Sequence, residues 1–137
     1  MVIARFLDGR VEKGTTRDFS PTRPSFHLFP GGDESLKSIE IEILSLKALF
    51  FVKTFHGDAT RDDLYDFETV RGQGRRVAVT FDDGETVAGY TMGYSPNKPG
   101  FFVIPADRDS NNERIYVVNH ADVNVNFLAA GSAFDAA

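Results

Sequence analysis

The residues of this sequence best suited to holding a ligand are three arginines just before a predicted strand. Arg71, Arg75 and Arg76 lie in the segment RGQGRR, whose two glycines keep the backbone flexible. A guanidinium group donates planar, paired hydrogen bonds, so Arg71 and Arg75 together can hold a phosphodiester or the edge of a guanine. The same segment is also consistent with a basic connector that is only solvated.

No group of residues has the spacing of a catalytic or metal centre. The three histidines, His27, His56 and His120, are far apart in the chain, and Ser20 and Ser95 each precede a proline outside any nucleophile motif. The chain has no cysteine, which excludes disulfides, thiolate zinc sites and cysteine nucleophiles. We therefore expect no enzyme, no cofactor and no metal.

Alternating oxygen side chains in one loop resemble a calcium-binding loop. Asp107, Asp109 and Asn111 carry them, but Asn112 stands where such a loop requires glycine. A polar hairpin whose side chains cap their own backbone is the alternative, and we favour it.

Composition and charge limit the function further. The chain has 137 residues and a net charge of -5, which argues against a protein that coats nucleic acid. Its first nine residues carry Arg5 and Asp8 and lack the apolar core of a signal peptide, and no stretch is long enough to span a bilayer. We expect a cytoplasmic protein without membrane contact.

The chain contains an internal repeat. Residues 2–30 align without a gap with residues 77–105, and beyond them a one-residue slip aligns 41–44 with 115–118. The matches include the glycines and prolines that set backbone geometry. The aligned pairs are Phe6 with Phe81, Asp8-Gly9 with Asp83-Gly84, Gly14 with Gly89, Ser20-Pro21 with Ser95-Pro96, Pro24 with Pro99, Phe26 with Phe101, and Pro30 with Pro105.

Each copy has the pattern of a β-meander. Alternating apolar residues predict strands, Asp-Gly predicts a tight hairpin, and Ser-Pro-x-x-Pro predicts a loop at the rim of a small barrel. We therefore expect an all-β protein made of two tandem five-stranded SH3-like or Sm-like barrels packed together. The expected units are a first barrel over 1–55, a connector over 56–76, a second barrel over 77–127 and a flexible tail over 128–137.

One segment has apolar residues on consecutive positions. The run LSLKALFFVKTF, residues 44–55, predicts a strand with both faces covered, although a helix is an alternative. We favour the strand, because its counterpart over 123–127 alternates cleanly. The two barrels are expected to pack together here.

The candidate binding site lies at the barrel rim beside the arginines. Its predicted residues are Arg71, Arg75, Arg76, Tyr94, Ser95, Lys98, Asp18 and Ser20. Arginines spaced like Arg71 and Arg75 ahead of a barrel, with Asp-x-Ser at the end of its second strand, resemble the PilZ family of cyclic di-GMP receptors. This sequence departs from the family pattern. Gly93 stands where the motif after Arg75 has aspartate, Lys98 replaces its final glycine, and the copy with Asp18 and Ser20 has no arginine pair before it.

A broader resemblance covers nearly the whole chain. The strings GYSPNKPGFF and DSNNER are similar to those of an uncharacterised bacterial domain family. That resemblance implies a β-barrel module and no particular activity. We thus expect a non-catalytic binding or regulatory module that contacts another protein, or a second copy of itself, through the barrel rim. The alternative is a cyclic dinucleotide or RNA held by Arg71–Arg76, although the overall charge disfavours nucleic acid.

Overall fold

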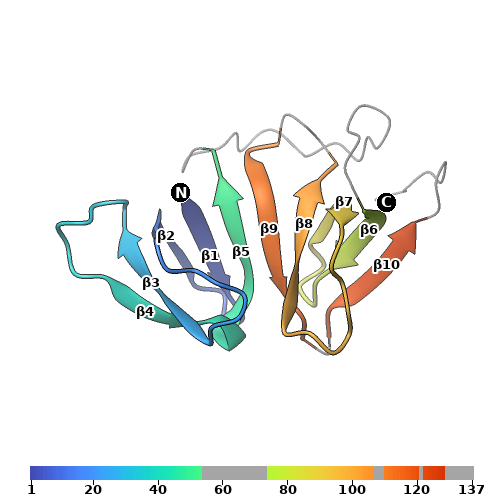
Figure 1. Cartoon of the computed structure of the whole chain (residues 1–137), viewed down its shortest axis with the longest axis horizontal. Coiled ribbons are helices and arrows are strands. Elements are labelled where there is room, and N and C mark those ends of the chain that lie inside the picture. The colour runs from blue at the N-terminus through green and yellow to red at the C-terminus, as the bar shows by residue number, and fades with distance from the viewer. Residues whose placement is uncertain (54–73, 107–109, 121, 129–137) are drawn as a thin grey trace.

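Ten strands pair antiparallel in one continuous sheet (Figure 1). The computed structural model describes residues 1–53, 74–106, 110–120 and 122–128. The strand order across the sheet is β10-β6-β7-β8-β9-β5-β1-β2-β3-β4. The elements are β1 (Val2–Phe6), β2 (Val11–Thr15), β3 (Ser25–Pro30), β4 (Ile39–Glu42), the 3-10 turn η1 (Ile43–Ser45), β5 (Leu46–Val52), β6 (Arg75–Thr80), β7 (Thr86–Thr91), β8 (Gly100–Pro105), β9 (Asn112–Val118) and β10 (Asn124–Leu128).

The two repeats have the same internal arrangement. Within the first the order is β5-β1-β2-β3-β4, and within the second it is β10-β6-β7-β8-β9. The register agrees as well, since Gly14 lies opposite Pro30 and Gly89 lies opposite Pro105. The repeat seen in the sequence is therefore a repeat of structure.

Both predicted Asp-Gly hairpins are present. Gly9 has a φ of 94° and Gly84 a φ of 89°, the left-handed region that glycine adopts without strain. Each preceding aspartate accepts a hydrogen bond of 2.9 Å from a backbone N–H two residues on, Asp8 from Arg10 and Asp83 from Glu85. Aspartate and glycine together fix these turns.

The predicted alignment of the fourth strands is wrong by two residues. Phe26 lies opposite Ile41 and its counterpart Phe101 lies opposite Val117, so Ile41 corresponds to Val117 and not to Ile115. A shift of two residues leaves every side chain on the same face of a strand, so alternation cannot reveal it.

The expectation of two closed barrels is not confirmed, because the sheet is open. Instead of closing the second repeat onto β10, β9 pairs along its free side with β5 of the first repeat. The edges that remain are β4 and β10, at the two ends of the order. The all-β prediction is correct, but the repeats join by strand pairing rather than as two packed barrels.

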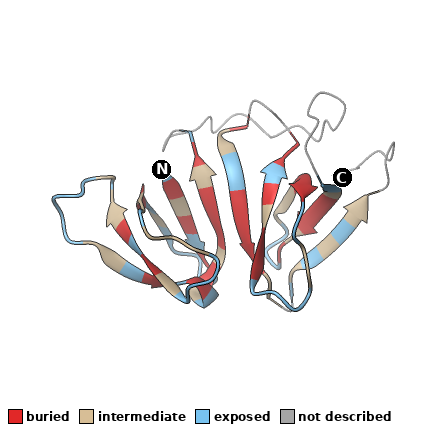
Figure 2. Cartoon of the chain, viewed as in Figure 1, coloured by how far each residue is buried: buried red, intermediate tan, exposed pale blue. Residues whose placement is uncertain are grey.

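From Leu46 to Val52 the doubly apolar segment 44–55 is a strand, as favoured, and not a helix. Leu44 and Ser45 belong to the 3-10 turn before it, and residues 54–55 lie outside the described residues. β5 directs Leu46 and Leu49 into one hydrophobic core and Ala48, Phe50 and Val52 into the other. Its partner β9 does the same, with Tyr116 and Val118 in the first core and Ile115 and Val117 in the second. β5 is buried along most of its length, and β9 is buried over its last four residues, Ile115–Val118 (Figure 2).

The boundaries between the units differ slightly from those expected. Arg75 and Arg76 belong to β6 rather than to the connector, and Leu128 belongs to β10 rather than to the tail. The remainder of the predicted connector, 56–73, and of the tail, 129–137, lies outside the described residues. In the described part of the chain, no helix has the length and apolar character needed to cross a membrane.

We predict that Gly89→Ala destabilises the fold by about 1–3 kcal/mol, because a side chain there collides with a neighbouring strand. A Cβ at Gly89 would lie 1.9 Å from the carbonyl oxygen of Ile104, which is backbone and cannot move aside. Urea unfolding measures the loss as a lower midpoint. The control is Gly93→Ala, whose Cβ would meet only the mobile Nζ of Lys98 at 3.9 Å. Equal midpoints for the two variants would contradict the prediction.

Candidate functional site

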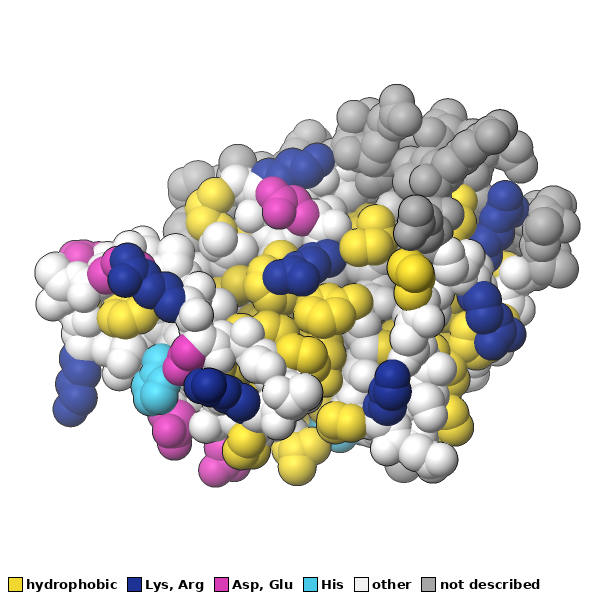
Figure 3. Space-filling model, in the orientation of Figure 1, with side chains coloured by type: hydrophobic (Ala, Val, Ile, Leu, Met, Phe, Trp, Pro, Cys, Tyr) yellow, Lys and Arg dark blue, Asp and Glu magenta, His cyan; other side chains and the backbone are white. Residues whose placement is uncertain are grey.

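Aromatic side chains from both repeats meet on one face of the sheet. Phe51 of β5, Phe102 of β8 and Phe19 of the β2–β3 loop are all half-buried, with ring centroids 5.6 to 6.4 Å apart. Tyr116 lies buried beneath them, 5.3 Å from Phe19 and 5.0 Å from Phe102. Figure 3 shows hydrophobic side chains gathered in the middle of this face, over the central strands.

An arginine lies on top of these rings. The guanidinium carbon of Arg114, on β9, is 4.3 Å from the Phe51 centroid and 4.8 Å from that of Phe102. Among the described residues, no carboxylate lies within ion-pair distance of Arg114. Cation–π contact leaves the N–H groups at the edge of a guanidinium able to donate. We call Phe19, Phe51, Phe102 and Arg114 the aromatic patch.

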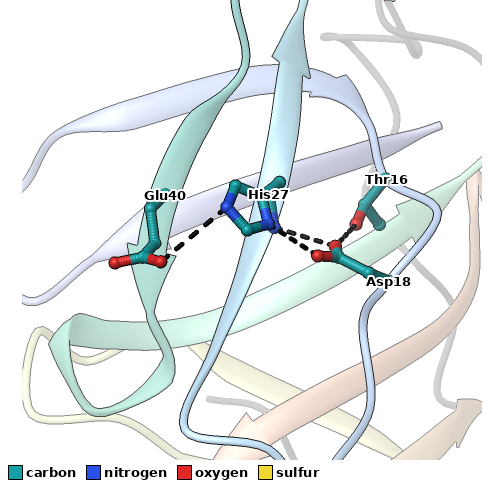
Figure 4. Close-up of polar contacts among 4 residues, drawn as sticks. All are labelled: Thr16, Asp18, His27 and Glu40. Atoms are coloured by element: carbon teal, nitrogen blue, oxygen red, sulfur yellow. Dashed lines mark hydrogen bonds and ion pairs between the residues drawn. The ribbon is translucent and has the colours of Figure 1, made fainter.

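The loop that supplies Phe19 is fixed by its neighbour, Asp18. One carboxylate oxygen of Asp18 accepts the backbone N–H of His27 at 2.8 Å, and the other lies 2.6 Å from the ring Nδ1 of His27 (Figure 4). Thr16 donates a further hydrogen bond to Asp18 at 3.3 Å. Asp18 therefore ties the loop to β3 rather than pointing at a ligand.

The same contacts shift the ionisation of both groups. The hydrogen bond to Asp18 raises the pKa of His27, and the charge of Glu40, whose carboxylate lies 3.7 Å from Nε2, adds to the effect. Partial burial raises the pKa of Asp18, but the hydrogen bonds from His27 outweigh it and the pKa ends below its ordinary value. The charged pair is therefore the favoured form of this contact at mildly acidic pH.

The second repeat has a corresponding cluster. Tyr94, the counterpart of Phe19, lies 4.9 Å from Phe101 and 5.3 Å from Phe127. Arg75 places its guanidinium carbon 3.6 Å from the Phe127 centroid. Two of the predicted site residues, Arg75 and Tyr94, thus both contact the ring of Phe127.

The other predicted site residues are divided between the two repeats. Ser95 and Lys98 form one turn, in which the Ser95 carbonyl accepts the Lys98 N–H at 3.1 Å and Asn119 donates to both carbonyls at 3.3 Å. Ser20 pairs its hydroxyl with that of Thr22 in the equivalent turn of the first repeat. Arg76 lies on β6 between Tyr90 and Leu128, and Arg71 lies outside the described residues. Neither Asp18 nor Ser20 makes a hydrogen bond or ion pair with the described arginines of β6, Arg75 and Arg76.

A pocket of about 430 Å³ lies where the two Asp-Gly turns approach each other. Lys47 crosses it from the first repeat, with Nζ 2.6 Å from a carboxylate oxygen of Asp83 and 2.7 Å from one of Glu85. The hydrogen bond from Lys47 lowers the pKa of Asp83. The lining residues are Phe6, Leu7, Asp8, Gly9, Lys47, Phe81, Asp82, Asp83, His120, Asp122 and Val123. We interpret Lys47 as a tie between the repeats.

The described residues contain no cluster of three or more histidine, aspartate or glutamate side chains that could hold a metal ion. The calcium-like loop falls partly on Asp107–Asp109, which lie outside the described residues. His120 contacts the backbone, with Nε2 2.8 Å from the Leu46 carbonyl oxygen. Since a carbonyl only accepts, Nε2 carries the proton.

The comparison with protein families covers both repeats. A family model matches residues 1–129. The chain belongs to this family of unknown function, DUF6982. No curated protein and no solved structure matches the chain. The membership agrees with the resemblance to an uncharacterised domain family, and it assigns no activity to the DUF6982 fold.

Sequence reasoning missed most of the aromatic patch. Phe51, Phe102 and Arg114 are far apart in the DUF6982 chain and meet only because β5 pairs with β9. One signal was present: Phe102 follows a buried phenylalanine, so it must occupy the opposite face of the strand. Nothing in the spacing showed that this face would meet Phe51.

We predict that Asp18→Asn lowers the pKa of His27 toward its ordinary value, because the amide removes the carboxylate that contributes most to stabilising the imidazolium, while Glu40 remains. A raised pKa in the folded state adds stability that is complete below the ordinary pKa and is lost as pH rises through the raised value. Proton NMR of the His27 ring measures the midpoint directly. Ser20→Ala changes the same loop without touching His27 and should leave its midpoint unchanged. A midpoint that does not move in Asp18→Asn would refute the assignment.

Proposed function

We propose that this chain is a non-catalytic binding module that recognises an apolar, acidic segment of another protein on the aromatic patch. The observation that carries the proposal is Arg114, an exposed guanidinium stacked on two half-buried rings without a carboxylate partner among the described residues. A carboxylate of the partner would complete this arginine, and apolar side chains would cover the rings.

The flanking loop supports a preformed surface. Phe19 is held between its tie at Asp18 and its ring contacts with Phe51 and Tyr116. Aromatic and arginine side chains on rigid elements are typical anchors of protein interfaces. The net charge of -5 favours a protein partner over nucleic acid, because the patch offers one local positive charge on an acidic molecule.

The fold supports a related proposal about origin. Each repeat keeps the order in which its fifth strand lies beside its first, the arrangement expected of a five-stranded SH3-like or Sm-like barrel. We interpret each repeat as such a unit, opened because its closing edge pairs with the other repeat. A fold does not by itself assign a function, so the binding role rests on the aromatic patch and not on this likeness.

We predict that Arg114→Gln weakens binding of an acidic probe peptide about tenfold, because it removes one charge-assisted hydrogen bond. The probe is an acetylated hexapeptide with phenylalanine and proline flanked by aspartates, compared with the same peptide carrying lysines instead. Amide chemical shifts of residues around Phe102 and Arg114 report binding. Only the acidic peptide should shift them in the wild-type protein.

The matched control is Arg10→Gln. Arg10 also stacks on a phenylalanine, with its guanidinium carbon 4.3 Å from the Phe6 centroid, but it lies outside the patch and already pairs with Asp8. This variant should bind the acidic peptide as the wild type does. Equal binding of both peptides, no binding of either, or shifts away from the patch would each count against the proposal.

The second candidate function is binding of a cyclic dinucleotide or RNA at Arg71–Arg76. The contact of Arg75 and Tyr94 with one ring favours it, because a guanidinium and an aromatic side chain are the groups that a flat base stacks on. We predict that cyclic di-GMP shifts the amides of Arg75, Arg76 and Tyr94 and that Arg75→Ala removes the shift. Unmoved signals at millimolar ligand would exclude this candidate.

A further inference from the structure

The two repeats are joined by a strand pair that is apolar on both faces. In this junction Ala48 lies opposite Val117, Leu49 opposite Tyr116 and Phe50 opposite Ile115. All six side chains are buried. The junction joins the fifth strand of one repeat to the fourth strand of the other, so it is a head-to-tail contact between unlike edges.

The two edge strands of the sheet, β10 and β4, are the counterparts of the two strands that form the junction. Val2 lies opposite Phe51 and its counterpart Val77 lies opposite Phe127, so β10 corresponds to β5. In the same way, β4 corresponds to β9, because each pairs with the third strand of its repeat, β3 or β8, in the same register. Strand β10 of one chain could therefore meet β4 of a second copy in the geometry of the junction. Such a contact would continue into a filament or a ring.

The free edges differ from the junction on one face each. On β10, Asn124 and Asn126 occupy the positions that Ala48 and Phe50 have on β5. On β4, Glu40 and Glu42 occupy the positions of Tyr116 and Val118 on β9. All four polar residues are exposed, and Figure 2 shows the resulting alternation along β10.

The inward faces of both edges remain apolar. Ile39 and Ile41 on β4 face the first core, and Val125 and Phe127 on β10 face the second. The polar residues are thus confined to the faces that a second copy would have to bury. In a copy-to-copy junction Glu40 would lie opposite Val125, where Tyr116 lies opposite Leu49. Its carboxylate would then be buried, with the His27 ring at 3.7 Å as its ion-pair partner among the described residues, and burial of such a pair costs desolvation energy.

We propose that Glu40, Glu42, Asn124 and Asn126 keep these matching edges from pairing, so that the chain remains a two-repeat unit instead of assembling head to tail with copies of itself. Unpaired strand edges readily add further strands, and charged or polar side chains on them are an effective block. Both edges contribute to this block. Asn124 and Asn126 would place polar groups on one face of the contact, and Glu40 and Glu42 would place them on the other.

The test restores the residues of the junction, one edge at a time. The β10 variant carries Asn124→Ala and Asn126→Phe, and the β4 variant carries Glu40→Tyr and Glu42→Val. Sedimentation measures the mass of each alone and of an equimolar mixture. Wild type and each single-edge variant should sediment as one chain, while the mixture should form a complex of two chains. A variant with all four changes should form larger assemblies.

The mixture also excludes general stickiness as an explanation. A sticky surface would make a single-edge variant associate with itself, which would overturn the proposal. So would a wild-type protein that associates through these edges, or a mixture that stays at one chain. Urea unfolding of each variant verifies that it is folded.

The register gives a second measurement that does not depend on mass. Because the chain has no cysteine, two single cysteines can be placed freely. Val125→Cys in the β10 variant and Glu40→Cys beside Glu42→Val in the second chain should form a disulfide on oxidation. Moving the second cysteine to position 42, beside Glu40→Tyr, should abolish it. Equal cross-linking from both positions would contradict the predicted register.

Discussion

The fold depends on one strand pair, β5 with β9, whose two faces supply two different cores. One repeat alone would be marginally stable, since a domain of about 60 residues buries only about 60% of the surface that its unfolded chain exposes. Each repeat contributes side chains to the core of the other. Tyr116 of the second repeat packs in the first core, and Phe50 of the first repeat packs in the second. Neither core can therefore form fully without the strand contributed by the other.

This sharing also explains why the sheet is open. A strand has two hydrogen-bonding sides, and those of β9 are used by β8 and β5. No side remains for closure onto β10, so the second repeat curls around its core without completing a ring. The register shift between Arg5 and Phe6 lets Leu46 and Leu49 face the same core although three positions separate them along the strand.

The sequence was a good guide to local structure and a poor one to how the repeats meet. Asp-Gly, Ser-Pro-x-x-Pro and the paired glycines act through backbone geometry over a few residues, so the hairpins, loops and strands follow from them directly. The consecutive apolar residues of β5 showed that both faces are covered. Both faces of β5 would be buried in two packed barrels as well as in one shared sheet. The apolar pattern therefore could not distinguish these two arrangements.

The binding surface was harder to predict for the same reason. Asp18 could be singled out as a loop residue, but its role in fixing Phe19 depends on His27, which comes from the next strand. The patch itself needs residues of β5, β8 and β9 at one place. Long-range pairing decides that place, and a single sequence carries no direct record of it.

The shared strands also make two equal repeats chemically unequal. Phe51 and Phe127 are counterparts, yet Phe51 receives its arginine from the other repeat, Arg114, whereas Phe127 receives Arg75 from its own. Phe51 also gains Phe102 as a neighbour across the junction, and Phe127, on the edge strand, gains no such ring among the described residues. Among the described residues, a wide aromatic surface built from both repeats therefore forms at the junction, and a single repeat could not display it.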